Sequence, residues 1–123
     1  MSKKISVLVI GCGNMGASHA TAYHNHPGFK ICGLVSRGKS KDDLNDSLKS
    51  NYQLFTDYKE AITNTKPDAV CISTYPDTHK EISLFALENN CHIFLEKPIA
   101  ADLKGSREII NKAEELGKKL VVG

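Results

Sequence analysis

Short apolar runs alternate with helical patterns along the whole chain of 123 residues. The apolar runs predict strands near residues 4–10, 29–36, 52–56, 69–74, 92–96 and 119–122. The segments between them predict helices near 14–26, 40–49, 57–64, 77–89 and 102–116. Such alternation implies parallel strands joined by right-handed crossovers, with helices on both faces. We therefore expect one α/β domain over residues 1–123, built on a doubly wound, six-stranded parallel sheet.

Residues at the ends of the predicted helices support these boundaries. Asp57 and Asp102 are natural N-caps, because a short carboxylate can accept hydrogen bonds from the first helical turn. Gly117 can end the last helix in the left-handed conformation. The apolar positions of that helix predict a buried stripe made of Ile109, Ile110, Ala113 and Leu116.

Composition excludes several classes of partner. The sequence has 16 Lys and Arg against 14 Asp and Glu, interspersed and without a basic block, so we expect no nucleic-acid partner. No apolar run is long enough to span a membrane, so we expect no membrane partner. The five histidines and four cysteines lack metal-ligand spacing, and we predict no metal site. Widely separated cysteines without a CxxC pair predict reduced thiols and a cytoplasmic protein.

A glycine motif lies between the first predicted strand and the first predicted helix. It reads Gly11-Cys12-Gly13-Asn14-Met15-Gly16. Gly11 can form the tight turn, Gly13 lets the main chain approach a diphosphate, and Gly16 lets the helix pack on its strand. The free N–H groups of the first helical turn would face the anion. Glycines also cluster in plain turns, but this context predicts the dinucleotide cradle of a Rossmann fold.

The end of the second predicted strand carries information about the cofactor. An acidic residue at this place normally accepts the ribose hydroxyls of NAD, whereas this sequence has Ser36 followed by Arg37. Arg37 could pair with a 2′-phosphate, and Lys39 or Lys41 could add charge. The pattern favours NADP over NAD. Alternatively, these cations are only solvated loop charges.

Three segments together carry a resemblance to a known family. They are residues 11–16 followed by His19, residues 74–81 (TYPDTHKE), and residues 92–100 (HIFLEKPIA). With them the chain closely resembles the glucose–fructose oxidoreductase and inositol dehydrogenase family, of which Glu96-Lys97-Pro98 is the most specific mark. The resemblance covers the N-terminal, nucleotide-binding half of a typical member, and the substrate domain of the family is expected to be absent.

The resemblance also implies roles for individual residues. Lys97 would be catalytic, pointing toward the nicotinamide and moving the proton of a substrate hydroxyl. Glu96 would hold Lys97 or contact the nicotinamide ribose, and His79 would support the cofactor site rather than transfer a proton. Tyr75 stands where the family usually has proline. The implied cofactor contacts are Gly11, Gly13, Asn14, Met15, Gly16, Ser36, Arg37, Thr74, Tyr75, Pro76, His79, Glu96 and Lys97.

Two functions follow as hypotheses. The first is the NAD(P)-binding part of an oxidoreductase of the sugar or cyclitol dehydrogenase type, which would bind a small polyol or sugar only if a second domain is supplied, and which we expect to show no turnover by itself. The alternative is a stand-alone nucleotide-binding or sensing module without enzymatic activity. In both cases the apolar strand at 119–122 would leave an open edge, through which the chain could form a homo-oligomer.

Overall fold

The computed structural model describes residues 4–123, so residues 1–3 of the predicted domain lie outside the described part. Over the described range six strands alternate with five helices. In chain order they are β1 Ile5–Ile10, α1 Asn14–Asn25, β2 Phe29–Val35, α2 Ser40–Ser47, β3 Leu54–Phe55, α3 Tyr58–Thr65, β4 Ala69–Ile72, α4 Pro76–Glu88, β5 His92–Leu95, α5 Leu103–Leu116 and β6 Leu120–Val122.

The strands form one parallel sheet in the order β3-β2-β1-β4-β5-β6. From β1 the chain moves outward to β2 and β3, then returns to the other side of β1 and continues through β4 to β6. The order therefore reverses between β1 and β4, the point at which ligands bind in sheets of this kind. The predicted fold class, a doubly wound Rossmann fold with six strands, is confirmed.

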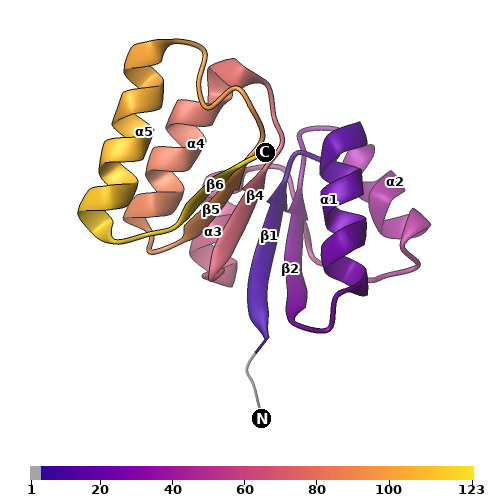
Figure 1. The fold of residues 1–123 in the computed structure, drawn as a ribbon. Coiled ribbons are helices and arrows are strands. Elements are labelled where there is room, and N and C mark those ends of the chain that lie inside the picture. The colour runs from indigo at the N-terminus through magenta and orange to yellow at the C-terminus, as the bar shows by residue number, and fades with distance from the viewer. Residues whose placement is uncertain (1–3) are drawn as a thin grey trace.

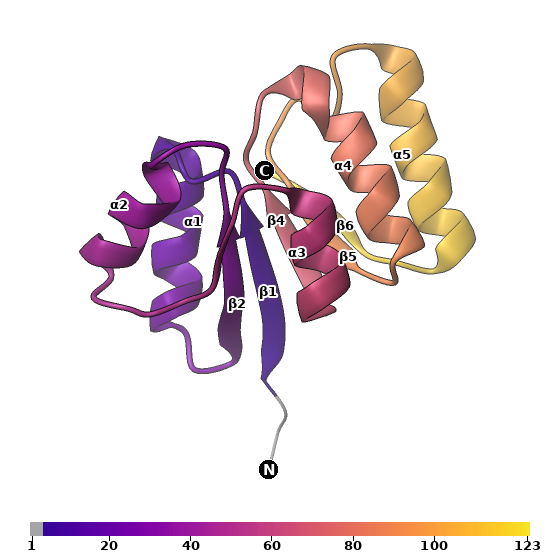
Figure 2. The same ribbon diagram turned by 180° about the vertical axis from the view of Figure 1, so that it is seen from behind.

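Helices cover both faces of the sheet. Both ribbon views place α1 and α2 on one face and α3, α4 and α5 on the other (Figures 1 and 2). Two apolar clusters fill the space between sheet and helices. The larger includes Ile72 and Leu95 of the sheet with Ile109 of α5, and the smaller includes Val9 of β1 with Ala20 of α1. Alternate residues of the four inner strands point to opposite faces, so β1, β2, β4 and β5 each contribute to both clusters.

The helix boundaries follow the predicted capping residues. The Asp102 carboxylate accepts a hydrogen bond from the N–H of Gly105 at 2.7 Å, and that of Asp57 accepts one from Lys59 at 3.2 Å. Gly117 ends α5 with a φ of 66°. The two aspartate caps and the glycine stop are thus confirmed.

Two local predictions are corrected by the structure. The strand expected at 52–56 has only the two residues Leu54 and Phe55, because β3 is an edge strand that pairs with β2 at two positions. In α5 the buried stripe consists of Gly105, Ile109 and Ala113, whereas Ile110 and Leu116 are exposed. The stripe repeats every four residues along one narrow face, since β6 ends the sheet and leaves the flank of α5 uncovered.

Candidate cofactor-binding site

The glycine turn between β1 and α1 depends on two close backbone approaches. Gly11 has a φ of 96°, and a Cβ on it would lie 2.6 Å from the carbonyl oxygen of Ser73. A Cβ on Gly16 would lie only 1.8 Å from the carbonyl oxygen of Gly11. Both positions therefore exclude a side chain, and α1 can begin directly against the turn only because Gly16 is a glycine.

Gly13 differs from these two glycines because it faces open space. It is exposed, and a Cβ built on it would meet nothing within 4 Å. Gly13 is also the N-cap of α1, which begins without a side-chain cap and without an acidic residue in its first turn. The N–H groups at this helix end thus have no side-chain acceptor and attract an anion. A bare main chain beside an uncapped helix end fits a diphosphate.

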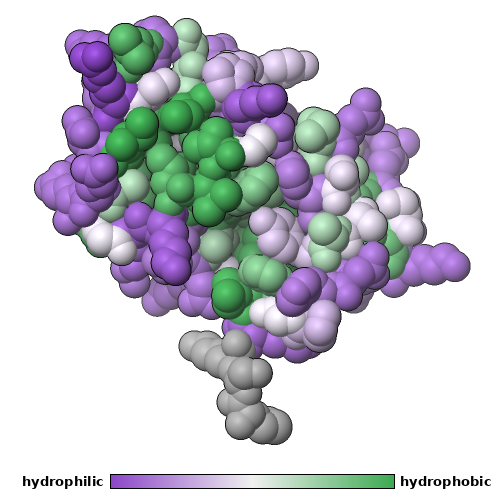
Figure 3. Space-filling view, in the orientation of Figure 1, coloured by the Kyte–Doolittle hydropathy of each residue, from purple (hydrophilic) through white to green (hydrophobic). Residues whose placement is uncertain are grey.

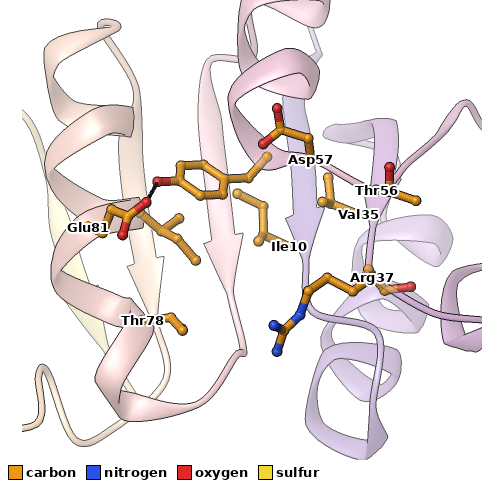
Figure 4. A pocket seen from close by; sticks show the side chains of 10 residues that line it. Ile10, Val35, Arg37, Thr56, Asp57, Thr78 and Glu81 are labelled. Carbon is orange, nitrogen blue, oxygen red and sulfur yellow. Dashed lines mark hydrogen bonds between the residues drawn. The ribbon is translucent and has the colours of Figure 1, made fainter.

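A cavity of about 280 Å³ opens beside this turn, and we call it the β2–α4 cavity. Its walls come from the ends of β1 and β2, the start of α3 and the first turns of α4 (Figure 4). Figure 4 shows the side chain of Arg37 extending from the residues after β2 into the space before α4. At the far wall the Tyr58 hydroxyl donates to Glu81 at 2.5 Å, which joins α3 to α4. The residues lining the cavity are Ile10, Val35, Ser36, Arg37, Thr56, Asp57, Tyr58, Thr78, Glu81 and Ile82.

A second cavity of about 440 Å³ lies over the glycine turn, and we call it the glycine-turn cavity. It shares Ser36 and Arg37 with the β2–α4 cavity, so the two form one path along the carboxyl ends of the strands. Met15 and Tyr75 also line it, and both side chains are exposed. The lining residues are Gly11, Cys12, Gly13, Asn14, Met15, Ser36, Arg37, Ser40, Ser73, Thr74 and Tyr75. Most of the predicted cofactor contacts are therefore brought together along this path.

Ser36 and Arg37 differ in how far they are available to a ligand. The Ser36 hydroxyl donates to the carbonyl oxygen of Gly38 at 3.0 Å and accepts from the N–H of Lys41 at 3.1 Å. The ammonium group of Lys41 donates a hydrogen bond to the same carbonyl oxygen of Gly38 at 2.6 Å. Ser36 thus shapes the turn after β2, whereas the exposed Arg37 is the cation that faces both cavities.

His79 lies beneath this path rather than on it. Its side chain has no exposed surface, and its Nε2 and Nδ1 lie 3.0 Å and 2.9 Å from the carbonyl oxygens of Thr74 and Pro98. His79 therefore holds together the residues that follow β4 and the residues that follow β5. Because it is buried, any effect of His79 on a ligand acts through these two segments. Pro76 is half-buried as the first residue of α4.

Glu96 and Lys97 lie at the end of β5 and line neither cavity. Glu96 was expected to hold Lys97 or to contact a ribose, but in the structure its carboxylate accepts a hydrogen bond from His19 Nε2 at 2.8 Å. The His19 ring also packs edge-on against Phe94, with the ring centroids 4.8 Å apart. Lys97 is exposed, and its peptide bond to Pro98 is cis.

The cysteine inside the glycine motif is not a reactive group. Cys12 is buried, and its thiol donates to the carbonyl oxygen of Val35 at 3.5 Å. Burial raises the pKa of this thiol from 9.0 to about 11, so it stays protonated at neutral pH. Within residues 4–123 no three potential metal ligands come together, and no helix is both long and apolar enough to cross a membrane.

A glycine turn at the point of strand reversal, an uncapped helix end and a continuous path across the strand ends define a dinucleotide-binding domain. Residues 5–123 match the family described as "Oxidoreductase family, NAD-binding Rossmann fold". The chain thus belongs to the glucose–fructose oxidoreductase and inositol dehydrogenase family, and a nicotinamide dinucleotide is its cofactor.

Known relatives agree with this assignment. The chain is 30% identical over 121 residues to inositol 2-dehydrogenase of Rubrobacter xylanophilus, covering 98% of this chain and 35% of that protein. It is 28% identical over 120 residues to D-glucoside 3-dehydrogenase of Escherichia coli, covering 97% of this chain and 34% of that protein. The crystal structure of GenD2 from gentamicin A biosynthesis, in complex with NAD, superposes on this chain with a TM-score of 0.90 at 25% identity. The superposition covers 100% of this chain and 35% of GenD2. The chain spans about a third of the length of these proteins.

Sequence reasoning missed part of the site. Thr56, Tyr58, Thr78 and Glu81 line the β2–α4 cavity but were not predicted to do so. The signal was present, because Thr56 follows β3 and therefore lies at the same edge of the sheet as Ser36. The contact between His19 and Glu96 was also missed, since it depends on how α1 is tilted against β5.

Proposed function

We propose that this chain supplies the cofactor-binding part of an oxidoreductase that acts on a sugar or a cyclitol. The observation that carries the proposal is the open main chain at Gly13, next to the uncapped end of α1 and in the wall of the glycine-turn cavity. The relatives, an inositol dehydrogenase and a glucoside dehydrogenase, support the substrate class.

The bound cofactor would supply the hydride acceptor, so the protein must orient it and manage a proton. We propose that the adenosine lies in the β2–α4 cavity, beside Arg37, and the diphosphate at the glycine turn. Lys97 would then take the proton of the substrate hydroxyl on its amine. Its exposure and its place outside both cavities support a site in which further residues enclose the substrate, so that the 123-residue chain binds cofactor without turnover. A cytoplasmic location stays a prediction that rests on the four free cysteines.

The cofactor preference provides the experiment. We expect the chain to bind NADP more tightly than NAD, because Arg37 can pair with the 2′-phosphate and no carboxylate stands at Ser36. Replacing Ser36 with Asp should move the ratio of the two dissociation constants toward NAD by about tenfold or more, through like-charge repulsion. Calorimetric titration of both cofactors at one salt concentration measures this ratio.

A matched substitution separates local from general charge effects. Ser47→Asp adds the same charge at the exposed far end of α2 and should leave the ratio unchanged. A chain that preferred NAD by tenfold before any substitution would overturn the NADP assignment, while leaving the proposed binding function in place.

We also propose that the open edge of the sheet is a contact between copies of the chain. β6 is an edge strand, and its Val121 and Val122 are 54% and 40% exposed. Figure 3 shows an apolar area beside the C-terminus, in the region where Figure 1 places β6 and α5. Unpaired main-chain groups next to exposed apolar side chains favour association.

Light scattering across a concentration series should therefore detect dimers or larger species. Val121→Lys should shift the chain toward the monomer, because a lysine on an edge strand opposes pairing. Leu54→Lys at the opposite edge, on the two-residue β3, is the control and should leave association unchanged. A wild-type chain that stays monomeric over the whole series would contradict the proposal.

A further inference from the structure

Tyr75 has an unusual position for an aromatic side chain. It is 74% exposed, the largest fraction among the exposed large hydrophobic residues of the described chain. It is the N-cap of α4, where its carbonyl oxygen accepts the hydroxyl of Thr78 at 2.7 Å. In residues 4–123 its own hydroxyl has no hydrogen-bond partner. The main chain is thus held in place while the ring projects into the solvent.

The ring stands over the cofactor path. Tyr75 lines the glycine-turn cavity together with Met15, a second exposed apolar side chain that comes from α1. Exposed apolar groups from two separate elements at one cavity are typical of a surface that a ligand covers. A flat ring entering this cavity would bury part of both side chains.

The position of Tyr75 along the path indicates which ring of the dinucleotide, adenine or nicotinamide, would contact it. The β2–α4 cavity extends from the residues that follow β2 and β3 to the first turns of α4, and Tyr75 is not among its lining residues. Tyr75 directly follows Thr74, whose carbonyl is joined through His79 to Pro98, the residue after Lys97. Tyr75 therefore lies on the side of the path that leads to Lys97, which is the nicotinamide end if the cofactor is bound as proposed above.

We propose that Tyr75 is an aromatic platform for the nicotinamide ring and makes the domain favour the oxidised cofactor. The inference rests on the proposed cofactor-binding function. The oxidised nicotinamide ring carries a positive charge and the reduced ring is neutral. The face of an aromatic ring attracts a cation, so Tyr75 stabilises the oxidised form more than the reduced form. An aliphatic side chain of similar size would contact both forms equally.

Three ligands, two variants of Tyr75 and one control variant test the proposal by calorimetry. The ligands are the oxidised cofactor, the reduced cofactor and ADP-ribose, which lacks the nicotinamide. Tyr75→Leu should weaken binding of the oxidised cofactor by about three- to tenfold and that of the reduced cofactor less, with ADP-ribose unchanged. Tyr75→Phe keeps the aromatic face and should bind all three ligands like the wild type. Leu103→Ala, which removes a 68% exposed side chain outside both cavities, is the matched control.

The outcomes separate this inference from the proposed function. If Tyr75→Leu weakened ADP-ribose as much as the oxidised cofactor, or weakened both redox forms equally, Tyr75 would not be a platform for the charged ring. Cofactor binding would then still stand. A wild-type chain that bound neither the dinucleotides nor ADP-ribose would overturn the proposed function together with this inference.

Discussion

Replacing Gly13 with valine is expected to weaken cofactor binding by at least about tenfold, the equivalent of about 1.4 kcal/mol, while the fold stays intact. The fold should tolerate the change because a Cβ at this position meets nothing within 4 Å, and because a φ of −74° is open to any residue. The same open space is where we place the diphosphate. A branched side chain there would fill it and cover the N–H groups at the start of α1.

Calorimetry on the purified variant measures the loss, and its melting temperature reports on the fold. Ala22→Val provides a control, because it adds a valine to the exposed face of the same helix, away from the turn. Unchanged cofactor affinity in a folded Gly13→Val chain would falsify our placement of the diphosphate.

Replacing Gly16 with alanine is expected to damage the fold itself. The added Cβ would lie 1.8 Å from the carbonyl oxygen and 2.7 Å from the carbonyl carbon of Gly11, and both contacts are with main chain that cannot rotate away. The helix must move off the turn, so we expect a loss of about 3 kcal/mol in the free energy of unfolding. In a domain of this size that corresponds to a fall of about 10 °C in melting temperature.

Denaturant and thermal unfolding of the two alanine variants, Gly13→Ala and Gly16→Ala, compare the glycines directly. Gly13→Ala should change the free energy of unfolding by no more than about 1 kcal/mol, mostly through the poorer N-cap. If the two variants were equally stable, the close packing of α1 on the turn would not be needed for folding.

The fold could be predicted because its signals are local and agree with one another. The apolar runs, the two aspartate caps and Gly117 each indicated where an element begins or ends, and alternation then fixed the parallel sheet. The exposure of Ile110 and Leu116 could not be read in the same way. Both are apolar residues of an amphipathic helix, and only the position of β6 at the sheet edge decides which of them are covered.

The candidate site was predictable to the extent that strand ends meet at one edge of a parallel sheet. That rule places the glycine turn, Ser36, Arg37, Thr74 and Tyr75 on a common path. In the structure all of them line one or both of the two cavities. The role of Glu96 was harder to foresee, because its partner lies 77 residues earlier in the chain. Which side chain of α1 reaches β5 depends on the packing of the whole helix rather than on a motif.

The two ring nitrogens of the buried His79 lie within hydrogen-bonding distance of main-chain carbonyl oxygens, one on each side. A carbonyl oxygen is present whatever amino acid occupies a position. These two contacts with His79 therefore do not depend on which side chains residues 74 and 98 carry. Both contacts depend on the imidazole at position 79, so one buried side chain sets the spacing between the segment after β4 and the segment after β5.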